Sequence, residues 1–278
     1  MTFYLNFRSQ AVAGSVVDPY LIQGDQAIPP NVTTVPLPVV DGFFGGKDLL
    51  FAVHGFNVDY RTAVSSFAVL DRALALGDSS VMIGVLWPGD WWIPAVNYPF
   101  EGSDAMDCGR RLAGYCAAHF ASARSISFLS HSLGARLVLE AVSNLPRRIR
   151  LICLTAGAIN RSCLEAEYAA AARNADQICV LSSHEDTVLK LAYPIGDPIS
   201  NILHDDHTFF ERALGYDGPS NASRTLVHGP WQIPDDYNYK HSSYLPSADP
   251  PRWPRIAEYT RRAFFGEPQV PPSPFPRP

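Results

Sequence analysis

Residues 125–146 read SISFLSHSLGARLVLEAVSNLP, and this stretch decides how the rest of the chain is interpreted. Its first part, 126–129, is a short and mostly apolar run of the kind that forms a buried parallel strand. After Gly134 the apolar residues recur three and four positions apart, which is helical spacing, until Pro146 ends the pattern. The sequence therefore predicts a strand that turns directly into a helix within residues 130–134.

The turn SHSLG, residues 130–134, matches the nucleophile elbow G-x-S-x-G with Ser130 in place of the first glycine. Such a turn needs small residues two positions on either side of its central serine, because the strand and helix backbones crowd together there. Ser130 and Gly134 are both small, so Ser132 is the candidate nucleophile and the Leu133 amide a candidate oxyanion donor. The alternative is a polar loop in which Ser132 only caps the helix.

The composition is that of one large α/β domain. The chain has 278 residues, 47% of them hydrophobic, and we expect a single domain over residues 1–265 followed by a proline-rich tail, 266–278. The formal net charge of -5, without a Lys/Arg cluster, argues against a nucleic-acid partner and favours a small, neutral or apolar ligand. The tail has P-x-x-P spacing, but we expect a floppy or surface-draped end.

The amino terminus and the cysteines favour a cytoplasmic protein. MTFYLNFRSQ lacks the charged and apolar regions of an export signal, and no run of about 18 apolar residues predicts a membrane helix. The five cysteines include no C-x-x-C pair and lie mostly in apolar patterns, which favours buried free thiols over disulfides or a metal site. They are Cys108, Cys116, Cys153, Cys163 and Cys179.

Strand and helix patterns alternate along the chain, which predicts a mostly parallel sheet with helices on both faces. Strands are expected at residues 3–7, 32–40, 48–53, 81–87, 125–129, 149–155, 177–181 and 224–227. Helices are expected at residues 60–76, 103–120, 134–145, 162–173 and 253–264. The first two strands, both within residues 1–47, are expected at an edge of the sheet.

The central strand 48–53 ends in His54-Gly55-Phe56-Asn57. Gly55 lets the backbone turn sharply, so we expect the amides of Phe56 and Asn57 to be unpaired and available to a ligand. Such amides can supply the second half of an oxyanion hole, and Phe56 is the candidate donor. We interpret His54 as a hydrogen-bond partner that orients this loop rather than as a catalytic residue.

The next strand leads into residues 88–100, which are dense in large apolar side chains and prolines. Because this segment leaves the carboxyl end of a central strand, we expect an aromatic loop that hangs over the same sheet edge as the elbow. Trp91 and Trp92 would then form one wall of a substrate pocket, with Asn57 and His131 also contacting substrate. The alternative is that these aromatic residues pack on the core.

Residues 182–189, SSHEDTVL, follow the strand at 177–181. An acid just past a strand end, one strand pair after the nucleophile, fits the carboxylate of a Ser-His-Asp arrangement. Asp186 is the first choice because the apolar residues 188–189 would pin the loop to the sheet, and Glu185 is the second. A solvated acidic turn is the alternative.

The base must follow the acid in this chain order, which leaves four histidines, His204, His207, His228 and His241. We prefer His241 because it lies in a polar loop, 235–244, between the last strand and the last helix, where the chain can return over the elbow. Residues 204–207, HDDH, look like metal ligands, but two acids at a helix start are the more ordinary interpretation, so no metal is expected.

Six segments together resemble an uncharacterised bacterial α/β-hydrolase family typified by an HGFN strand end and an SHSLG-type elbow. They are LLFAVHGFNVDY (49–60), MIGVLWPGD (82–90), DCGRRLAGYC (107–116), FLSHSLGARLVLEAV (128–142), SSHEDTVL (182–189) and KHSSYL (240–245). The resemblance implies an α/β-hydrolase fold and a Ser-Asp-His arrangement on Ser132, Asp186 and His241. It also implies that the Ser130 form of the elbow is an ordinary variant. It does not imply a particular substrate.

These features predict a serine hydrolase that needs no cofactor and cleaves a small, largely apolar ester, with no membrane partner. An amidase, peptidase or thioesterase would use the same residues. A dehalogenase is disfavoured because it would place a carboxylate at position 132. A catalytically idle fold that serves as an interaction module is the alternative from another class. Neither the natural substrate nor the oligomeric state follows from the sequence.

Overall fold

The computed structural model describes residues 1–12, 14–89, 94–191, 212–246 and 252–269. One eight-stranded sheet has the order β3-β2-β1-β5-β4-β6-β7-β8. Adjacent strands in the part β1-β5-β4-β6-β7-β8 are parallel. β2 is antiparallel to both β1 and β3. The strands are β1 Thr2–Arg8, β2 Val16–Gly24, β3 Val32–Thr34, β4 Asp48–Val53, β5 Ser80–Leu86, β6 Ser125–His131, β7 Ile149–Thr155 and β8 Ala175–Leu181.

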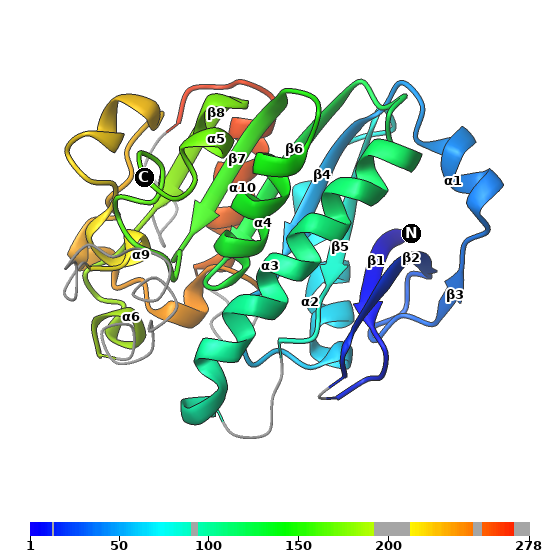
Figure 1. Cartoon of the computed structure of the whole chain (residues 1–278), viewed down its shortest axis with the longest axis horizontal. Coiled ribbons are helices and arrows are strands. Elements are labelled where there is room, and N and C mark those ends of the chain that lie inside the picture. Colours follow the sequence, from blue (N-terminus) through cyan, green and yellow to red (C-terminus); the bar gives the residue numbers. More distant parts are fainter. Residues whose placement is uncertain (13, 90–93, 192–211, 247–251, 270–278) are drawn as a thin grey trace.

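Helices cover both faces of the sheet, as the sequence predicts. α3 (Pro94–His119) and α4 (Gly134–Asn144) lie on one face, and α2 (Tyr60–Leu74) and α10 (Trp253–Phe264) lie on the other (Figure 1). The shorter helices are α1 Leu37–Phe43, α5 Ala169–Arg173, α6 Thr187–Leu191 and α9 Leu214–Asp217. Three short 3-10 helices follow α9, namely η1 Ser223–Leu226, η2 Asp235–Tyr237 and η3 His241–Ser243.

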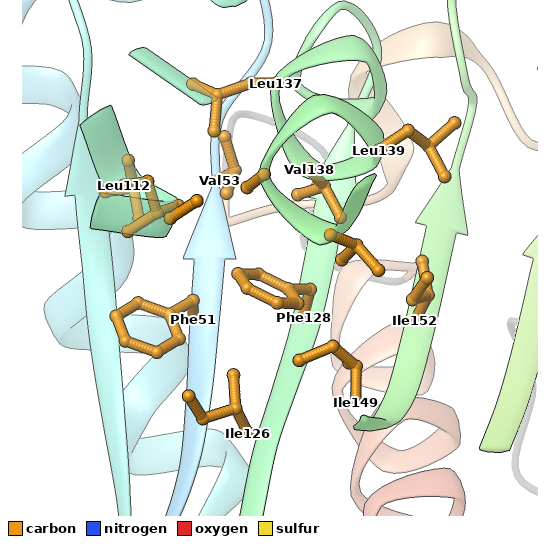
Figure 2. Close-up of a cluster of buried hydrophobic side chains, with 14 of the residues drawn as sticks. Phe51, Val53, Leu112, Ile126, Phe128, Leu137, Val138, Leu139, Ile149 and Ile152 are labelled. Carbon is orange, nitrogen blue, oxygen red and sulfur yellow. The ribbon is translucent and has the colours of Figure 1, made fainter. Parts of the chain in front are cut away.

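The continuous apolar runs of the central strands arise because both faces of the sheet are buried. Phe51 and Phe128 belong to the core under α3 and α4, while their strand neighbours Leu50 and Leu129 belong to the core under α2 and α10. The rings of Phe51 and Phe128 stack with centroids 5.4 Å apart. Figure 2 shows them beneath Val138 of α4, in the centre of the sheet. This packing holds β4 and β6, the two strands that lead into the predicted site.

The amino-terminal prediction is wrong in three respects. β1 is not an edge strand, because it lies between β2 and β5. β2, which the sequence patterns did not predict, is buried only at residues 21, 22 and 24, so it has neither a continuous apolar run nor a regular alternation. The extended segment expected at 32–40 ends at Thr34, and α1 begins at Leu37 with a proline in its first turn. Proline is compatible with a helix start, since the first-turn amides have no partner within the helix.

Three later predictions also need correction. α3 begins at Pro94, so residues 94–100 are helical rather than part of a loop, and Ser103 lies inside the helix instead of capping it. Only α5, from residue 169, is helical in the segment predicted as a helix from 162. The strand predicted at 224–227 is largely the 3-10 helix η1. In each case a short local pattern was compatible with more than one structure.

All five cysteines are buried and free, as the sequence predicts. Burial raises the pKa of the Cys108 and Cys116 thiols, which disfavours the reactive thiolate. Across the residues that the structure describes, no helix is both long enough and apolar enough to cross a bilayer.

Candidate active site

Ser132 lies in the turn between β6 and α4, and its φ of 54° is in the left-handed region that side chains other than glycine rarely adopt. Main-chain hydrogen bonds hold it there. Its amide donates to the Thr155 carbonyl at 3.0 Å, and its carbonyl accepts from the Ala158 amide at 3.1 Å. The strained turn is thus fixed by the end of β7 and by the residues that follow it.

Two glycines allow the loop after β4 to lie directly against this turn. β4 and β6 are paired in register at Val53 and Ser130, so the two loops leave the sheet at the same level. A Cβ added to Gly134 would lie 2.6 Å from the His54 carbonyl oxygen, and one added to Gly55 would lie 2.8 Å from Cβ of Ser132. Any larger residue would force the loop and the elbow apart.

Ser132, His241 and Asp186 form a chain of two hydrogen bonds. His241 Nε2 lies 2.9 Å from Ser132 Oγ, and His241 Nδ1 lies 2.8 Å from Asp186 Oδ2. Asp186 is fully buried, while the His241 side chain keeps 19% of its surface exposed. An imidazole between a hydroxyl and a carboxylate can accept the hydroxyl proton on one nitrogen while the carboxylate holds the other nitrogen protonated.

Asp186 and His241 lie in irregular segments, and side-chain hydrogen bonds connect these two segments. Asp186 directly precedes α6, where its Oδ1 accepts from the Leu189 amide at 3.0 Å, leaving Oδ2 for His241. Ser183 Oγ donates to the Tyr239 carbonyl at 2.8 Å, which ties the acid loop to the segment that leads to His241. Leu189 is buried, as expected, but Val188 is exposed and does not pack the loop against the sheet.

The loop after β4 is held from two sides. Trp87 Nε1 donates to the His54 carbonyl at 2.9 Å, and the Asn57 amide donates to the Gly89 carbonyl at 2.5 Å. The expectation that the Asn57 amide is unpaired is therefore wrong. For the Leu133 amide, in contrast, the described part of the chain supplies no hydrogen-bond acceptor.

His54 is buried and stacks on Trp87, with ring centroids 5.6 Å apart and an angle of 15° between the rings. Its Nδ1 lies 2.8 Å from the Gly55 carbonyl, so the ring contacts its own loop. Desolvation lowers the pKa of His54 to about 3, and the nearby Arg8 guanidinium acts in the same direction. His54 is therefore a neutral residue that supports the loop, in agreement with the role that the sequence predicts for it.

His131 contacts the base. Its Nε2 lies 2.7 Å from the main-chain oxygen of His241, and the two rings have centroids 4.9 Å apart. Desolvation and the neighbouring His241 lower the pKa of His131 to about 3. The expected contact of His131 with substrate remains a prediction.

The other sequence candidates lie apart from this cluster or outside the described residues. Glu185 is half-buried next to the acid, but the carboxylate that meets His241 is that of Asp186. His228 contacts Ile178 at the edge strand β8 through its amide and ring. The remaining candidates, namely Trp91, Trp92, His204 and His207, belong to segments that the structure does not describe.

Sequence reasoning did not predict the supporting contacts of Trp87 and Ser183. The apolar pattern predicts a strand that includes Trp87, but Trp87 directly follows β5 and is fully buried beside the site. One signal was available for Ser183, because a pair of small polar residues, 182–183, separates a buried strand from the candidate acid. Small hydroxyl side chains at such a point commonly bond to nearby backbone groups.

Residues 45–204 match the model of the family described as "Alpha/beta hydrolase of unknown function (DUF900)". The match spans more than half of the chain, so the protein belongs to this α/β-hydrolase family. The sheet order, the helices on both faces and the turn at Ser132 agree with an α/β-hydrolase fold.

Two solved structures are similar to parts of this one. The esterase PE8 is 15% identical, with 82% of this chain and 94% of that chain covered and a TM-score of 0.45. A structure from work on LipS and LipT, two metagenome-derived lipolytic enzymes, is 18% identical, with 50% of this chain and 52% of that chain covered and a TM-score of 0.29. Neither likeness bears on the substrate. Among curated proteins, the sequence has no match.

Proposed function

We propose that this protein is a serine hydrolase that cleaves a small, largely apolar carboxylic ester through an acyl-enzyme intermediate. One observation carries the proposal, namely the hydrogen-bonded chain from Ser132 Oγ through His241 to Asp186, with bonds of 2.9 and 2.8 Å. The left-handed backbone of Ser132 supports it, because strain at a non-glycine residue is concentrated at functional sites.

In the proposed reaction, Ser132 Oγ attacks the ester carbonyl carbon while His241 takes the hydroxyl proton. The tetrahedral intermediate collapses, the ester C–O bond breaks, and His241 gives its proton to the departing alcohol. A water molecule then attacks the acyl group on Ser132 while His241 takes a water proton. The bond between the acyl carbon and Ser132 Oγ breaks, His241 returns the proton to Oγ, and the acid is released. Asp186 keeps His241 in the tautomer that accepts on Nε2. The reaction as written needs no cofactor.

The amides of Leu133 and Phe56 are the proposed donors to the oxyanion. Leu133 follows the nucleophile at the start of α4, and Phe56 follows Gly55, whose backbone lies against Ser132. The Asn57 amide is engaged by Gly89, so it has no part in this proposal. One such donor contributes about 10²–10³ in rate, so both loops matter to turnover.

The choice of an apolar ester rests on the aromatic composition of residues 88–100, including Trp91 and Trp92, which we propose line the pocket with Asn57. Amides and thioesters would react through the same groups. A series of p-nitrophenyl esters of increasing acyl length, assayed with the wild type, S132A and H241A, tests the ester assignment. We expect short chains to turn over and each variant to lose about 10⁴-fold or more in kcat.

Full turnover by S132A would contradict the serine mechanism. A folded wild type that is inert on every ester would contradict the ester assignment and direct the search to amides and thioesters. If those substrates and a fluorophosphonate probe also gave no reaction, an idle interaction module would be the better description.

A further inference from the structure

His131 connects the nucleophile strand to the base through the main chain. It is the last residue of β6, directly before Ser132, and its Nε2 lies 2.7 Å from the carbonyl oxygen of His241. A carbonyl oxygen only accepts hydrogen bonds, so Nε2 of His131 carries the hydrogen and Nδ1 is the acceptor nitrogen of a neutral ring. The bond joins residues that are 110 positions apart in the sequence.

We propose that His131 is a positioning residue that holds the main chain of His241, so that the imidazole of His241 meets Ser132 Oγ and Asp186 together. This inference rests on the proposed function. It changes the role of His131 from one that contacts substrate to one that acts through the base.

The base needs such support because it lies in an irregular segment. His241 opens the three-residue 3-10 helix η3, which follows a left-handed residue, Asn238. The bond from Nδ1 to Asp186 orients the imidazole ring of His241, and the bond from Ser183 to the Tyr239 carbonyl holds the chain two residues earlier. His131 adds an attachment at the carbonyl of His241 itself, and its ring also packs against His241 and Tyr244, with centroids at 4.9 and 6.0 Å.

The surroundings of the His131 ring favour a supporting role over a substrate contact. Nε2 is engaged by His241, and a Cβ added to Gly55 would lie 3.0 Å from Nδ1, so both nitrogens face protein groups. The pKa of about 3 keeps the ring neutral at physiological pH. A neutral ring allows His241 to become charged during the reaction, which a cation at 4.9 Å would oppose.

Two amide substitutions test the inference as a matched pair. The side-chain nitrogen in H131Q reaches the position of Nε2 and can donate to the His241 carbonyl. The side-chain nitrogen in H131N reaches only as far as Nδ1 and cannot. Both variants are polar, neutral and smaller than histidine, so they differ mainly in whether the bond forms. Circular dichroism and urea unfolding check that both fold.

We expect H131N to lower kcat by about 10- to 100-fold while KM changes by less than about threefold, because misplacing a reacting group acts on the chemical step. H131Q should restore most of the lost turnover. The second measurement needs no substrate: the proton NMR signal of the His241 Nδ1–H that bonds to Asp186, assigned with ¹⁵N-labelled histidine. H131N should broaden or abolish this signal, and H131Q should retain it.

Three outcomes would overturn the inference. A rise in KM at constant kcat in H131N would make His131 a substrate-binding residue. Equal losses of kcat in H131Q and H131N would show that the hydrogen bond from His131 to the His241 carbonyl does not affect turnover. An unchanged His241 signal in H131N would show that the base is held without His131. The NMR result stands even if wild type hydrolyses none of the esters, so failure of the proposed function is distinguishable from failure of this inference.

Discussion

The two sides of the site are built differently. On the nucleophile side, Ser132 and the loop at Gly55 leave adjacent, register-paired strands of the central sheet, and backbone contacts hold them. On the other side, Asp186 and His241 lie at the starts of very short helices, α6 and η3, and side-chain hydrogen bonds connect their segments.

The difference indicates how each side tolerates change. The geometry of the nucleophile follows from regular elements and small residues, so an added methyl group is damaging there. The geometry of the acid and base follows from a few polar groups, so a change of one atom can disable them while the fold survives. Substitutions on each side test this difference, and the largest effect is expected at the acid.

D186N tests the base side. The substitution retains the shape of the side chain and its Oδ1 acceptor for the Leu189 amide, but it removes the charge that holds His241 in the tautomer able to accept from Ser132. We expect kcat to fall by about 10⁴-fold with the secondary structure unchanged. E185Q, at the neighbouring acid, is the control and should stay within about twofold because the buried carboxylate that meets His241 is that of Asp186. Comparable losses in both variants would contradict the choice of Asp186.

G134A tests the nucleophile side. Alanine is a better helix former than glycine by about 1 kcal/mol, so the substitution would stabilise α4 if space allowed it. The new Cβ would instead lie 2.6 Å from the backbone oxygen of His54. We expect a loss of about 2–4 kcal/mol in the free energy of unfolding, with reduced activity. The matched control is G114A in α3, where a Cβ meets nothing within 4 Å and which should stabilise the protein. Equal effects in urea unfolding would remove the steric argument.

The buried histidine His54 gives a smaller effect, on the pH dependence of stability. Its pKa of about 3 in the folded protein lies below the ordinary value of 6.5. Between pH 3 and pH 6.5, His54 is protonated in the unfolded chain but neutral in the folded protein. The contribution of His54 to the free energy of unfolding is therefore fully present above pH 6.5 and falls as the pH is lowered toward 3.

H54N should therefore flatten the dependence of unfolding free energy on pH between about 7 and 5, by up to about 1.4 kcal/mol per pH unit. The pKa of His131 is lowered in the same way, so part of the pH dependence of the unfolding free energy remains in H54N. Urea unfolding at several pH values across that range measures it. An identical slope in wild type and H54N would show that folding does not lower the pKa of His54.

The sequence predicted best what local patterns determine. The elbow at 130–134 lies where a strand period changes to a helical one, and the structure has β6 and α4 on its two sides. The choice of Asp186 and His241 followed from chain order and loop position, and the structure brings both to Ser132. Local patterns were ambiguous at 32–40, where only 32–34 form a strand and α1 begins at Leu37, and at 224–227, which are largely the 3-10 helix η1.

The sequence could not predict the supporting contacts between loops. The bond from Trp87 to His54, the bond from Ser183 to Tyr239 and the bond between the Asn57 amide and Gly89 each depend on how loops fold over the sheet edge. No periodicity encodes them. The expectation of an unpaired Asn57 amide failed for this reason, since its acceptor lies on the loop after a different strand.

Covalent labelling with a fluorophosphonate shows whether Ser132 is an activated nucleophile. The probe reacts with a serine that a neighbouring base has activated, and mass spectrometry of the digested protein locates the adduct. We predict one phosphonyl group on Ser132, lost in S132A and slowed strongly in H241A. A folded wild type that takes up no probe, or an adduct on another residue with Ser132 unmodified, would contradict the role of Ser132 as the nucleophile.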